Sequence, residues 1–378
     1  MKILQAFDFL SLPHGGGTVD IVYRLSKALA SRGHEVTICT GDYEVDWKYL
    51  SGLGDVGLKM YRSYFNRHGI YLTPGLAKLD VKEYDIVHLH CYRSIQNIIL
   101  AQKARKYGIP YIIDAHGSTV ARTGRKTMLL GAYDKLTGRR LICDARYLIA
   151  ETNVGVDEWL LLGGYERQIK IQHPLLDTSE FDVLPDKGTF RRKHNLGNST
   201  IIMFLGRIHH AKGIDTLLNA SRRFLLNRDT LLIVAGQDDG YRNAITHLAQ
   251  VLNMQERVVF VGYLSGTDKL AALVDADVLV QPSRNEAGAR PSLEAIMCHT
   301  PVAVSKDTGA GKVIASFEGG LLFRSWDAGE LADRIQEIID NPGEAKARTE
   351  KARAYIEANL SLANGIVGYE QLYQEAVS

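Results

Sequence analysis

The sequence has few cysteines and no long hydrophobic run. Its four cysteines are scattered without a C-x-x-C spacing, at Cys39, Cys91, Cys143 and Cys298, which argues against a disulfide framework. No segment approaches the roughly 20 apolar residues that a membrane-spanning helix needs, and the opening run MKILQAFDF is too short for a signal peptide. We therefore expect a cytoplasmic protein that touches a membrane at most peripherally.

The composition is that of an ordinary globular protein, with 46% hydrophobic and 23% charged residues. Its 378 residues exceed the length that a single core usually serves. The net charge of +2 is unevenly distributed, because residues 1–175 carry 23 Lys and Arg against 17 Asp and Glu, whereas residues 176–378 carry 22 against 26. This predicts two domains, the first basic and the second acidic.

Short apolar, strand-like runs alternate with amphipathic helical patterns in both halves of the chain. Strands are expected at 2–7, 35–40, 85–90, 110–116, 147–151, 169–173, 201–206, 231–236, 257–262, 278–283 and 301–305. Helices are expected at 18–32, 94–107, 126–142, 153–163, 213–227, 240–252, 266–275, 291–298 and 326–341. The alternation predicts an α/β fold of two doubly wound, Rossmann-like domains with parallel sheets.

A polar stretch containing Pro174 and Pro185 interrupts this alternation and predicts the boundary between the domains. The last helical pattern has no strand to cover in the second domain, so we expect it to pack back on the first. Ligands of such sheets bind at the carboxyl ends of the strands, which predicts a cleft between the domains. The expected division is a first domain at 1–174, a linker at 175–186, a second domain at 187–355 and a returning helix at 356–378.

The segment His14-Gly15-Gly16-Gly17 allows three interpretations. An esterase oxyanion hole would also require a G-x-S-x-G elbow, which the sequence lacks. A dinucleotide fingerprint would require a third glycine where Asp20 stands. A glycine loop before a helix, whose free amides and dipole attract an anion, remains, alongside a plain flexible loop.

The second half contains charged residues at the predicted carboxyl ends of strands. Arg207 and Lys212 flank the turn after the strand at 201–206, and cations there suit a diphosphate, although solvated loop cations look the same. Seven residues separate Glu286 from Glu294 in PSRNEAGARPSLEAIMC. The expected helix starts beside Pro291 without a good N-cap residue, so its amides are open to an anion. The two carboxylates suit the vicinal hydroxyls of a sugar or ribose.

These motifs resemble those of the retaining GT-B glycosyltransferases of family 4, the glycosyl transferases group 1, over essentially the whole chain. The resemblance implies that Glu294 binds the ribose and that Glu286 acts at the donor sugar. It also implies that Arg207 and Lys212 hold the diphosphate and that the amides of Gly16 and Gly17 reach it. The loop Gly288-Ala289-Arg290 would line the donor site, and His116, in DAHGS, would contact the sugar near the reacting centre as a catalytic residue.

Two departures from the family pattern stand out. Glu286 is followed by Ala287-Gly288-Ala289 where members usually read G-F-G, which leaves the choice of sugar open. The family's N-G-V-D linker is replaced by HPLLD at 173–177. The D-x-D pair Asp275 and Asp277 precedes a strand rather than following it, so we interpret it as a turn and expect no metal or other cofactor.

The implied reaction moves a hexosyl group with retention from a UDP- or GDP-sugar to a glycan, lipid-linked or small-molecule hydroxyl. The departing phosphate oxygen would accept the proton, and His116 would act as a neutral donor or through its carbonyl. We expect His88 and His90 to point to opposite faces of their strand, with one facing the cleft. A nucleotide-sugar epimerase or a non-catalytic nucleotide-sugar binder remains the alternative.

The acceptor side is expected in the first domain, where residues 121–140 gather basic and apolar side chains. A basic amphipathic helix of this kind can lie on an anionic membrane, and a solvated charged face is the simpler interpretation. Aromatic residues are not interleaved with these charges, so nucleic acid is not an expected partner.

Overall fold

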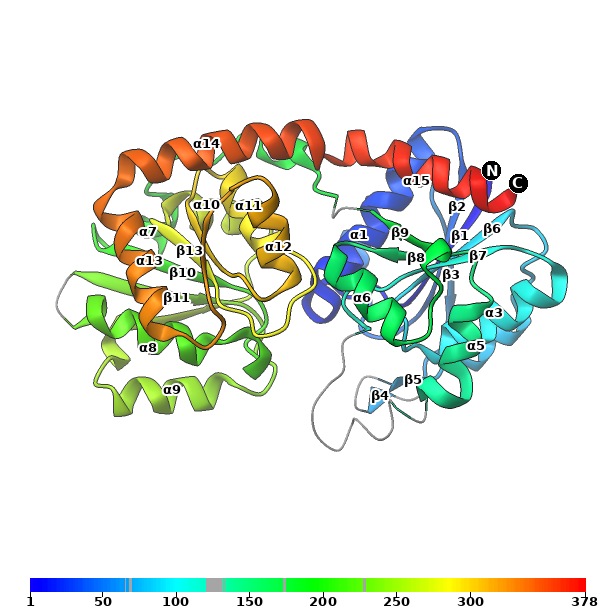
Figure 1. The fold of residues 1–378 in the computed structure, drawn as a ribbon, viewed down its shortest axis with the longest axis horizontal. Coiled ribbons are helices and arrows are strands. Elements are labelled where there is room, and N and C mark those ends of the chain that lie inside the picture. Colours follow the sequence, from blue (N-terminus) through cyan, green and yellow to red (C-terminus); the bar gives the residue numbers. More distant parts are fainter. Residues whose placement is uncertain (65, 68–69, 120–130, 132, 173–174, 227–228) are drawn as a thin grey trace. The chain divides into compact units, whose positions relative to one another are not determined.

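The computed structural model describes residues 1–64, 66–67, 70–119, 131, 133–172, 175–226 and 229–378. It divides into two compact units: unit 1 comprises Met1–Leu175 with Leu362–Ser378, and unit 2 comprises Leu176–Ser361. Each unit is a parallel sheet with helices on both faces (Figure 1). The predicted fold class, two Rossmann-like α/β domains, is therefore confirmed.

Unit 1 is built on a seven-stranded sheet in the order β3-β2-β1-β6-β7-β8-β9, parallel throughout. Its strands are β1 (Lys2–Phe9), β2 (Glu35–Gly41), β3 (Gly57–Tyr61), β6 (Ile86–His90), β7 (Tyr111–Asp114), β8 (Tyr147–Ala150) and β9 (Ile169–Ile171). A short antiparallel pair, β4 (Asn66–Arg67) and β5 (Ile70–Tyr71), lies outside this sheet. The central strands β1, β6 and β7 carry the residues of most interest below.

Helices α1 (Leu12–Ser31) and α15 (Leu362–Val377) pack on one face of this sheet, and α3 (Ile95–Tyr107), α5 (Arg139–Cys143) and α6 (Asn153–Leu161) pack on the other. Ser94 and Thr152 cap α3 and α6 by accepting hydrogen bonds from backbone amides of the first turn. Shorter helical segments are α2 (Trp47–Leu50), Pro74–Lys78, Asp134–Gly138 and Glu166–Gln168.

Unit 2 is built on a six-stranded parallel sheet in the order β12-β11-β10-β13-β14-β15. Its strands are β10 (Thr200–Leu205), β11 (Thr230–Ala235), β12 (Val258–Gly262), β13 (Val278–Gln281), β14 (Val302–Ser305) and β15 (Leu321–Phe323). The strand order reverses between β10 and β13, the point where doubly wound sheets bind their ligands.

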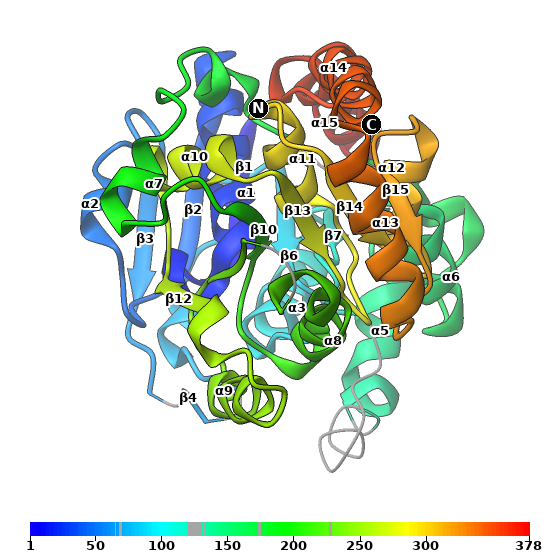
Figure 2. The same ribbon diagram turned by 90° about the vertical axis from the view of Figure 1, so that its left-hand side faces the viewer.

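The helices of unit 2 form two layers, as Figure 2 shows end-on to the unit. One layer contains α7 (Thr189–His194), α10 (Gly266–Asp275), α11 (Arg290–Met297), α12 (Gly309–Ser316) and most of α14 (Pro342–Asn359). The other contains α8 (Ile214–Leu225), α9 (Arg242–Val251) and α13 (Ala328–Asp340). Three-residue helical turns lie at His210–Lys212 and Gln255–Arg257, and another short turn at Thr178–Phe181.

Several elements differ from the sequence-based prediction. Helix α1 begins at Leu12, not near residue 18, because Pro13 suits a first turn and the glycines continue the helix. The last helical pattern is two helices, which break at Leu360 and Ser361 where the chain passes from unit 2 to unit 1. The prediction also missed α7, α12, β3 and β15, which are short and carry no strong apolar run.

The D-x-D pair has a structural role in unit 2. The Asp275 carboxylate accepts hydrogen bonds from the backbone amides of Gly188 and Arg191, so it caps α7. Asp277 accepts from the Ile201 amide and pairs with Arg191 at 2.9 Å. Both precede β13, at the amino end of the strand, as predicted, but Asp275 is the last residue of α10 rather than part of a turn.

We predict that Asp275→Ala lowers the free energy of unfolding by roughly 2–4 kcal/mol, because two backbone amides lose their buried acceptor. Urea denaturation followed by circular dichroism measures the change. Asp268→Ala is the matched control, since Asp268 pairs with Lys193 in solvent and should shift the midpoint little. An unchanged midpoint for Asp275→Ala would contradict the capping role.

Candidate functional site

The charged residues predicted in the second half lie at the carboxyl ends of neighbouring strands of unit 2. Arg207 and Lys212 follow β10, and Glu286 follows β13, which pairs with β10. Parallel pairing brings these loops to the same edge of the sheet. Charged side chains are therefore concentrated at this edge, where the strand order reverses.

Lys212 and Glu286 form an ion pair, and each side chain is only about one-fifth exposed, at 19% and 20%. The Ser283 hydroxyl donates to Glu286 Oε2 at 3.1 Å. The Gly309 amide at the start of α12 donates to the Glu286 carbonyl at 2.7 Å. Glu286 is thus fixed through both its side chain and its backbone, which preorganises its carboxylate.

Glu294 lies in α11 and is almost fully buried. Its Oε1 accepts from Lys269 Nζ at 3.0 Å and from Arg290 Nε at 3.1 Å. Burial lowers the pKa of Lys269, but the adjacent Glu294 carboxylate outweighs this, and the net pKa is raised. The buried carboxylate is therefore paired with two cations rather than left alone.

The remaining predicted donor residues have different surroundings. Arg207 pairs with Asp239 at 2.6 Å and is half exposed. It therefore lies outside the Lys212–Glu286 ion pair. The Gly288 carbonyl accepts from Gln281 at 3.2 Å. Ala289 is fully buried in the core under α11, so only its backbone could face a ligand.

A close backbone approach shapes this edge. Gly213, directly after Lys212, has φ +68, and a Cβ atom there would lie 2.0 Å from the Pro282 carbonyl oxygen. Only glycine fits both the left-handed conformation and this contact. The turn that carries Lys212 is thereby pressed against the loop that carries Glu286.

The glycine loop predicted in unit 1 is wrong. Gly16 and Gly17 lie inside α1, where each amide bonds to the carbonyl four residues earlier. Only the first four amides of a helix are free of such bonds, so those of Gly16 and Gly17 are not available to an anion. The anion-attracting end of this helix is at Leu12, next to Ser11, which provides no side-chain cap.

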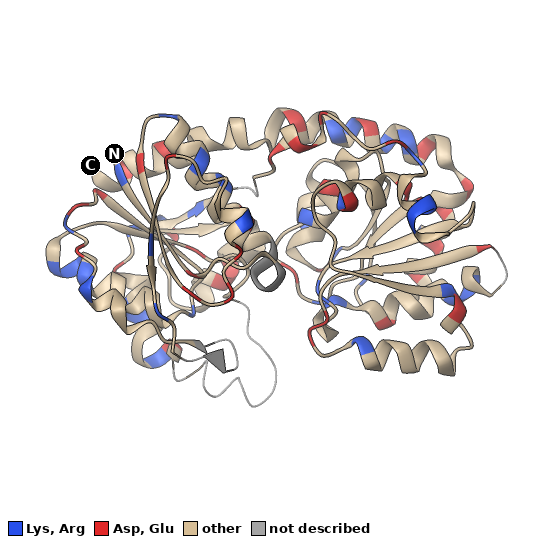
Figure 3. Cartoon of the chain, turned by 180° about the vertical axis from the view of Figure 1, so that it is seen from behind, with Lys and Arg blue, Asp and Glu red and all other residues tan. Residues whose placement is uncertain are grey.

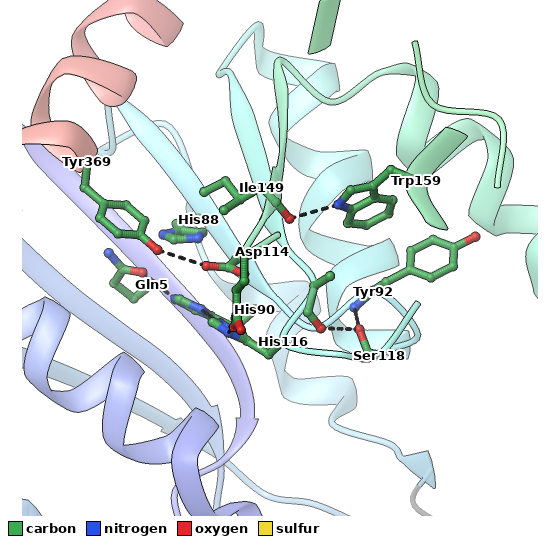
Figure 4. Close-up of polar contacts among 12 residues, drawn as sticks. Gln5, His88, His90, Tyr92, Asp114, His116, Ser118, Ile149, Trp159 and Tyr369 are labelled. Carbon is green, nitrogen blue, oxygen red and sulfur yellow. Dashed lines mark hydrogen bonds and ion pairs between the residues drawn. The ribbon is translucent and has the colours of Figure 1, made fainter. Parts of the chain in front are cut away.

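His116 lies just beyond β7, and its ring is buried in a polar cluster (Figure 4). Its Nε2 is 2.8 Å from His90 Nδ1, and its Nδ1 is 3.4 Å from Asp114 Oδ1 and 3.5 Å from Glu151 Oε1. Burial lowers the pKa of His116, but the two carboxylates raise it further, so the net shift is upward. Burial raises the pKa of Asp114 to about 6. The backbone at His116 is left-handed, with φ +46.

The prediction that His88 and His90 point to opposite faces of β6 is wrong. Residues two apart on a strand share a face, and the two rings are 4.1 Å apart between centroids. Both rings are buried, and burial holds the pKa of each well below its usual value. They lie on the face of the sheet that α15 covers.

Two groups of side chains in the described part of unit 1 are close enough to share a cation, with ligand-type atoms within 4.8 Å of one another. One contains His88, His90 and Asp114, and the other contains Asp114, His116 and Glu151. Both ring nitrogens of His90 already form hydrogen bonds, to His116 and Gln5. In the first group, His90 therefore has no ring nitrogen left to bind a cation.

Sequence reasoning missed Lys269, Ser283, Asp114 and Glu151. Asp114 and Glu151 could have been found from the sequence, because each stands near the carboxyl end of a predicted strand. Asp114 is the first residue of DAH, and Glu151 follows YLIA. Lys269 lies in a helix remote from every motif and gave none. Ser283 belongs to the PS pair that precedes Glu286 but was not assigned a role.

The basic segment predicted for the acceptor falls partly outside the described residues, which lack 120–130 and 132. In the described part, Lys135, Leu136, Arg139 and Arg140 are all exposed on the turn Asp134–Gly138 and on α5, and Figure 3 marks the charges along the chain. Among the described helices, none combines the length and the apolar character that a membrane crossing requires.

Two family models match the chain. Residues 15–180 match Glycosyltransferase Family 4, and residues 186–355 match Glycosyl transferases group 1. Together they take in most of the chain, with the boundary between them close to the boundary between the two units.

Proteins named as glycosyltransferases are similar in sequence to this chain. An uncharacterized glycosyltransferase of Methanocaldococcus jannaschii is 23% identical over 84% of each chain. The D-inositol 3-phosphate glycosyltransferase of Mycolicibacterium smegmatis is 28% identical over 78% of this chain and 68% of its own.

Solved structures with the same fold include GT-B glycosyltransferases. Anabaena HepE in complex with UDP and glucose superposes with a TM-score of 0.84 at 18% identity, over 99% of this chain and 100% of its own. Sucrose-phosphate synthase from Thermosynechococcus elongatus gives 0.77 at 21% identity, over 99% and 98%. At these identities the likeness establishes the fold.

We predict that Gly213→Ala destabilises the protein more than Gly197→Ala does. Both glycines have a left-handed backbone, but a Cβ at Gly197 meets nothing within 4 Å. The control should cost about 1–2 kcal/mol from the backbone alone, and Gly213→Ala roughly 1–3 kcal/mol more from the clash with Pro282. Urea midpoints measure both, and equal losses would contradict the close approach.

Proposed function

The chain belongs to the GT-B glycosyltransferases of family 4, and on that basis we propose that it transfers a hexosyl group from a UDP- or GDP-sugar to a hydroxyl with retention. One observation carries the proposal: two glutamates at the switch point of unit 2, Glu286 and Glu294, are each paired with cations whose side chains are less than one-fifth exposed. Such fixed carboxylates accept hydrogen bonds from vicinal hydroxyls, and the cations beside them suit phosphate oxygens. The complexes of HepE with UDP and with UDP-glucose support UDP as the first donor to test.

In this proposal Glu294 binds the ribose hydroxyls and Glu286 binds the hydroxyls of the donor sugar. Lys212 and Arg207 bind the diphosphate. An arriving diphosphate competes with Glu286 for the Lys212 ammonium, which frees Glu286 to accept from the sugar. The ion pair between them therefore holds both side chains in place until the donor binds.

The chemistry proposed needs no metal ion. Charge on the leaving diphosphate is offset by Lys212, Arg207 and the amides at the start of α11, where no side chain caps the helix. Donors that are fixed before the reaction stabilise developing charge without reorganisation. The departing phosphate oxygen accepts the proton of the acceptor hydroxyl on the same face of the sugar, and His116 contacts the donor sugar.

The acceptor is proposed to bind unit 1 as a glycan, a small molecule or a lipid-linked sugar. Support for a lipid comes from the exposed Leu136, whose side chain is flanked by Lys135 and followed by Arg139 and Arg140. Apolar and basic groups side by side favour the surface of an anionic membrane. This would place the enzyme in the cytoplasm, peripherally on the inner face of a membrane.

We predict that Lys212→Ala weakens binding of UDP-glucose at least tenfold, because a partly buried cation on a diphosphate contributes more than 1.4 kcal/mol. Isothermal titration calorimetry with UDP-, GDP- and ADP-glucose, each with and without EDTA, measures the affinity and the need for metal. Glu294→Ala should lower affinity for both UDP-glucose and UDP.

Lys351→Ala is the matched control, since Lys351 also pairs with a glutamate, Glu318, but in solvent. It should bind UDP-glucose as the unaltered protein does. If neither UDP-, GDP- nor ADP-glucose binds, or if Lys212→Ala binds as tightly as Lys351→Ala, the proposed function is wrong. Conversion of the sugar without release of UDP would instead identify an epimerase.

A further inference from the structure

Three side chains of unit 1 come together where two neighbouring strands of its sheet end. Asp114 is the last residue of β7, and Glu151 directly follows β8, which pairs with β7. His116 lies two residues beyond Asp114, so the end of β7 contributes two of the three side chains. Parallel pairing holds both strand ends at one edge of the sheet, and the group is therefore carried by rigid elements.

The distances within this group match those between the ligands of a four-coordinate ion. His116 Nδ1 lies 3.4 Å from Asp114 Oδ1 and 3.5 Å from Glu151 Oε1, and the three atoms all lie within 4.8 Å of one another. A tetrahedral zinc ion with its ligands about 2.1 Å away separates neighbouring ligand atoms by roughly 3.4 Å. An octahedral ion with ligands at about the same distance separates them by roughly 3.0 Å. The spacing therefore favours a tetrahedral ion.

Two of these three atoms are buried and lack a hydrogen bond. Within the described residues, neither His116 Nδ1 nor Asp114 Oδ1 has a hydrogen-bond partner, although their side chains are only 3% and 2% exposed. Burying polar atoms without partners is costly, and a cation among them would offset the charge of both carboxylates. The Glu151 side chain is 14% exposed, which leaves an ion a route to the group.

The contacts behind this group are of the kind that orients metal ligands. His116 Nε2 forms a hydrogen bond with His90 Nδ1 at 2.8 Å, and the two rings are nearly parallel, at 11°. Tyr369 of α15 donates to Asp114 Oδ2 at 3.1 Å, a contact drawn in Figure 4. In metal sites the second nitrogen of a histidine ligand and the free oxygen of a carboxylate ligand are hydrogen-bonded in this way. His116 Nδ1 and Asp114 Oδ1 are thus left to face the ion.

We propose that Asp114, His116 and Glu151 form a zinc-binding site with three protein ligands and one open position. Sets of three histidine and carboxylate ligands, with water in the fourth position, are typical of zinc sites that also bind small molecules. The imidazole favours zinc over magnesium and calcium, which prefer ligand sets made of oxygen alone. This site is separate from the donor chemistry proposed above, which uses no metal ion.

Zinc bound at this site inhibits the transfer, a consequence that rests on the proposed function. The ion occupies Nδ1 of His116, and His90 already occupies Nε2. No ring nitrogen then remains for the donor sugar that His116 is proposed to contact. We therefore expect zinc to slow the hydrolysis of UDP-glucose and EDTA to restore it.

Isothermal titration calorimetry of the untagged, full-length protein with Zn²⁺ tests the site itself. We expect one zinc ion per chain and no binding of Mg²⁺ under the same conditions. X-ray absorption at the zinc edge should show four nitrogen and oxygen ligands at about 2.0–2.1 Å, one of them an imidazole. Loss of an outer partner alone weakens a metal site about 10–100-fold. Tyr369→Phe should therefore weaken zinc binding about tenfold, and Glu151→Gln, which removes a ligand, by more than that.

His299→Gln is the matched control. His299 also lies beside a carboxylate, Glu350 at 2.7 Å, but both side chains are more than two-fifths exposed, so the variant should bind zinc as the unaltered protein does. His88→Gln separates the two candidate groups, because His88 belongs only to the other one and its Nδ1 already bonds Tyr373 of α15 at 2.8 Å. It should also keep the zinc site. Circular dichroism checks that each variant folds, and His116→Gln is the second variant that removes a ligand.

Binding of less than one equivalent of zinc, or zinc binding that both Glu151→Gln and His116→Gln leave unchanged, would overturn the proposal. So would loss of the zinc in His299→Gln or His88→Gln, because the ion would then lie elsewhere. Hydrolysis of UDP-glucose that bound zinc leaves unchanged would overturn the inhibition. If zinc binds with the expected ligands but UDP-glucose is neither bound nor hydrolysed, the proposed function fails and the zinc site stands.

Discussion

Parallel pairing of the strands is the constraint on which both units depend. It forces every loop that follows a strand to one edge of its sheet, so residues distant in sequence gather there without any further device. In unit 2 this brings the turn of Lys212 beside the loop of Glu286. In unit 1 it brings Asp114, His116 and Glu151 to the ends of two neighbouring strands, β7 and β8.

The two edges treat their charges in related ways. In unit 2, Lys212 forms an ion pair with Glu286, and Lys269 and Arg290 form ion pairs with Glu294. Neither glutamate is therefore buried without a cation beside it. In unit 1 two carboxylates share the imidazole of His116. Buried charges are costly to leave unpaired, and the partners therefore fix the geometry of each group before any ligand arrives.

The fold was largely predictable, because short apolar runs that alternate regularly with amphipathic helical patterns are features of the local sequence. In unit 2, Lys212 and Glu286 were predictable from their positions after two strands, because the carboxyl ends of parallel strands lie at one edge of the sheet. Lys269 was not predictable, because it lies in a helix outside every motif. The contacts of α15 were not, because the partners of Tyr369 and Tyr373 are more than 250 residues away in sequence. The glycines misled for a local reason: three in succession suggest a loop, but Pro13 and the following residues start α1 before them.

The anomer of the first product distinguishes a retaining glycosyl transfer from an inverting one. UDP-α-glucose is incubated with the protein without an acceptor, and ¹H NMR records the released glucose before mutarotation equilibrates it. Retention predicts α-glucose as the first product, because the nucleophile enters on the face that the phosphate leaves. Release of β-glucose first would contradict it.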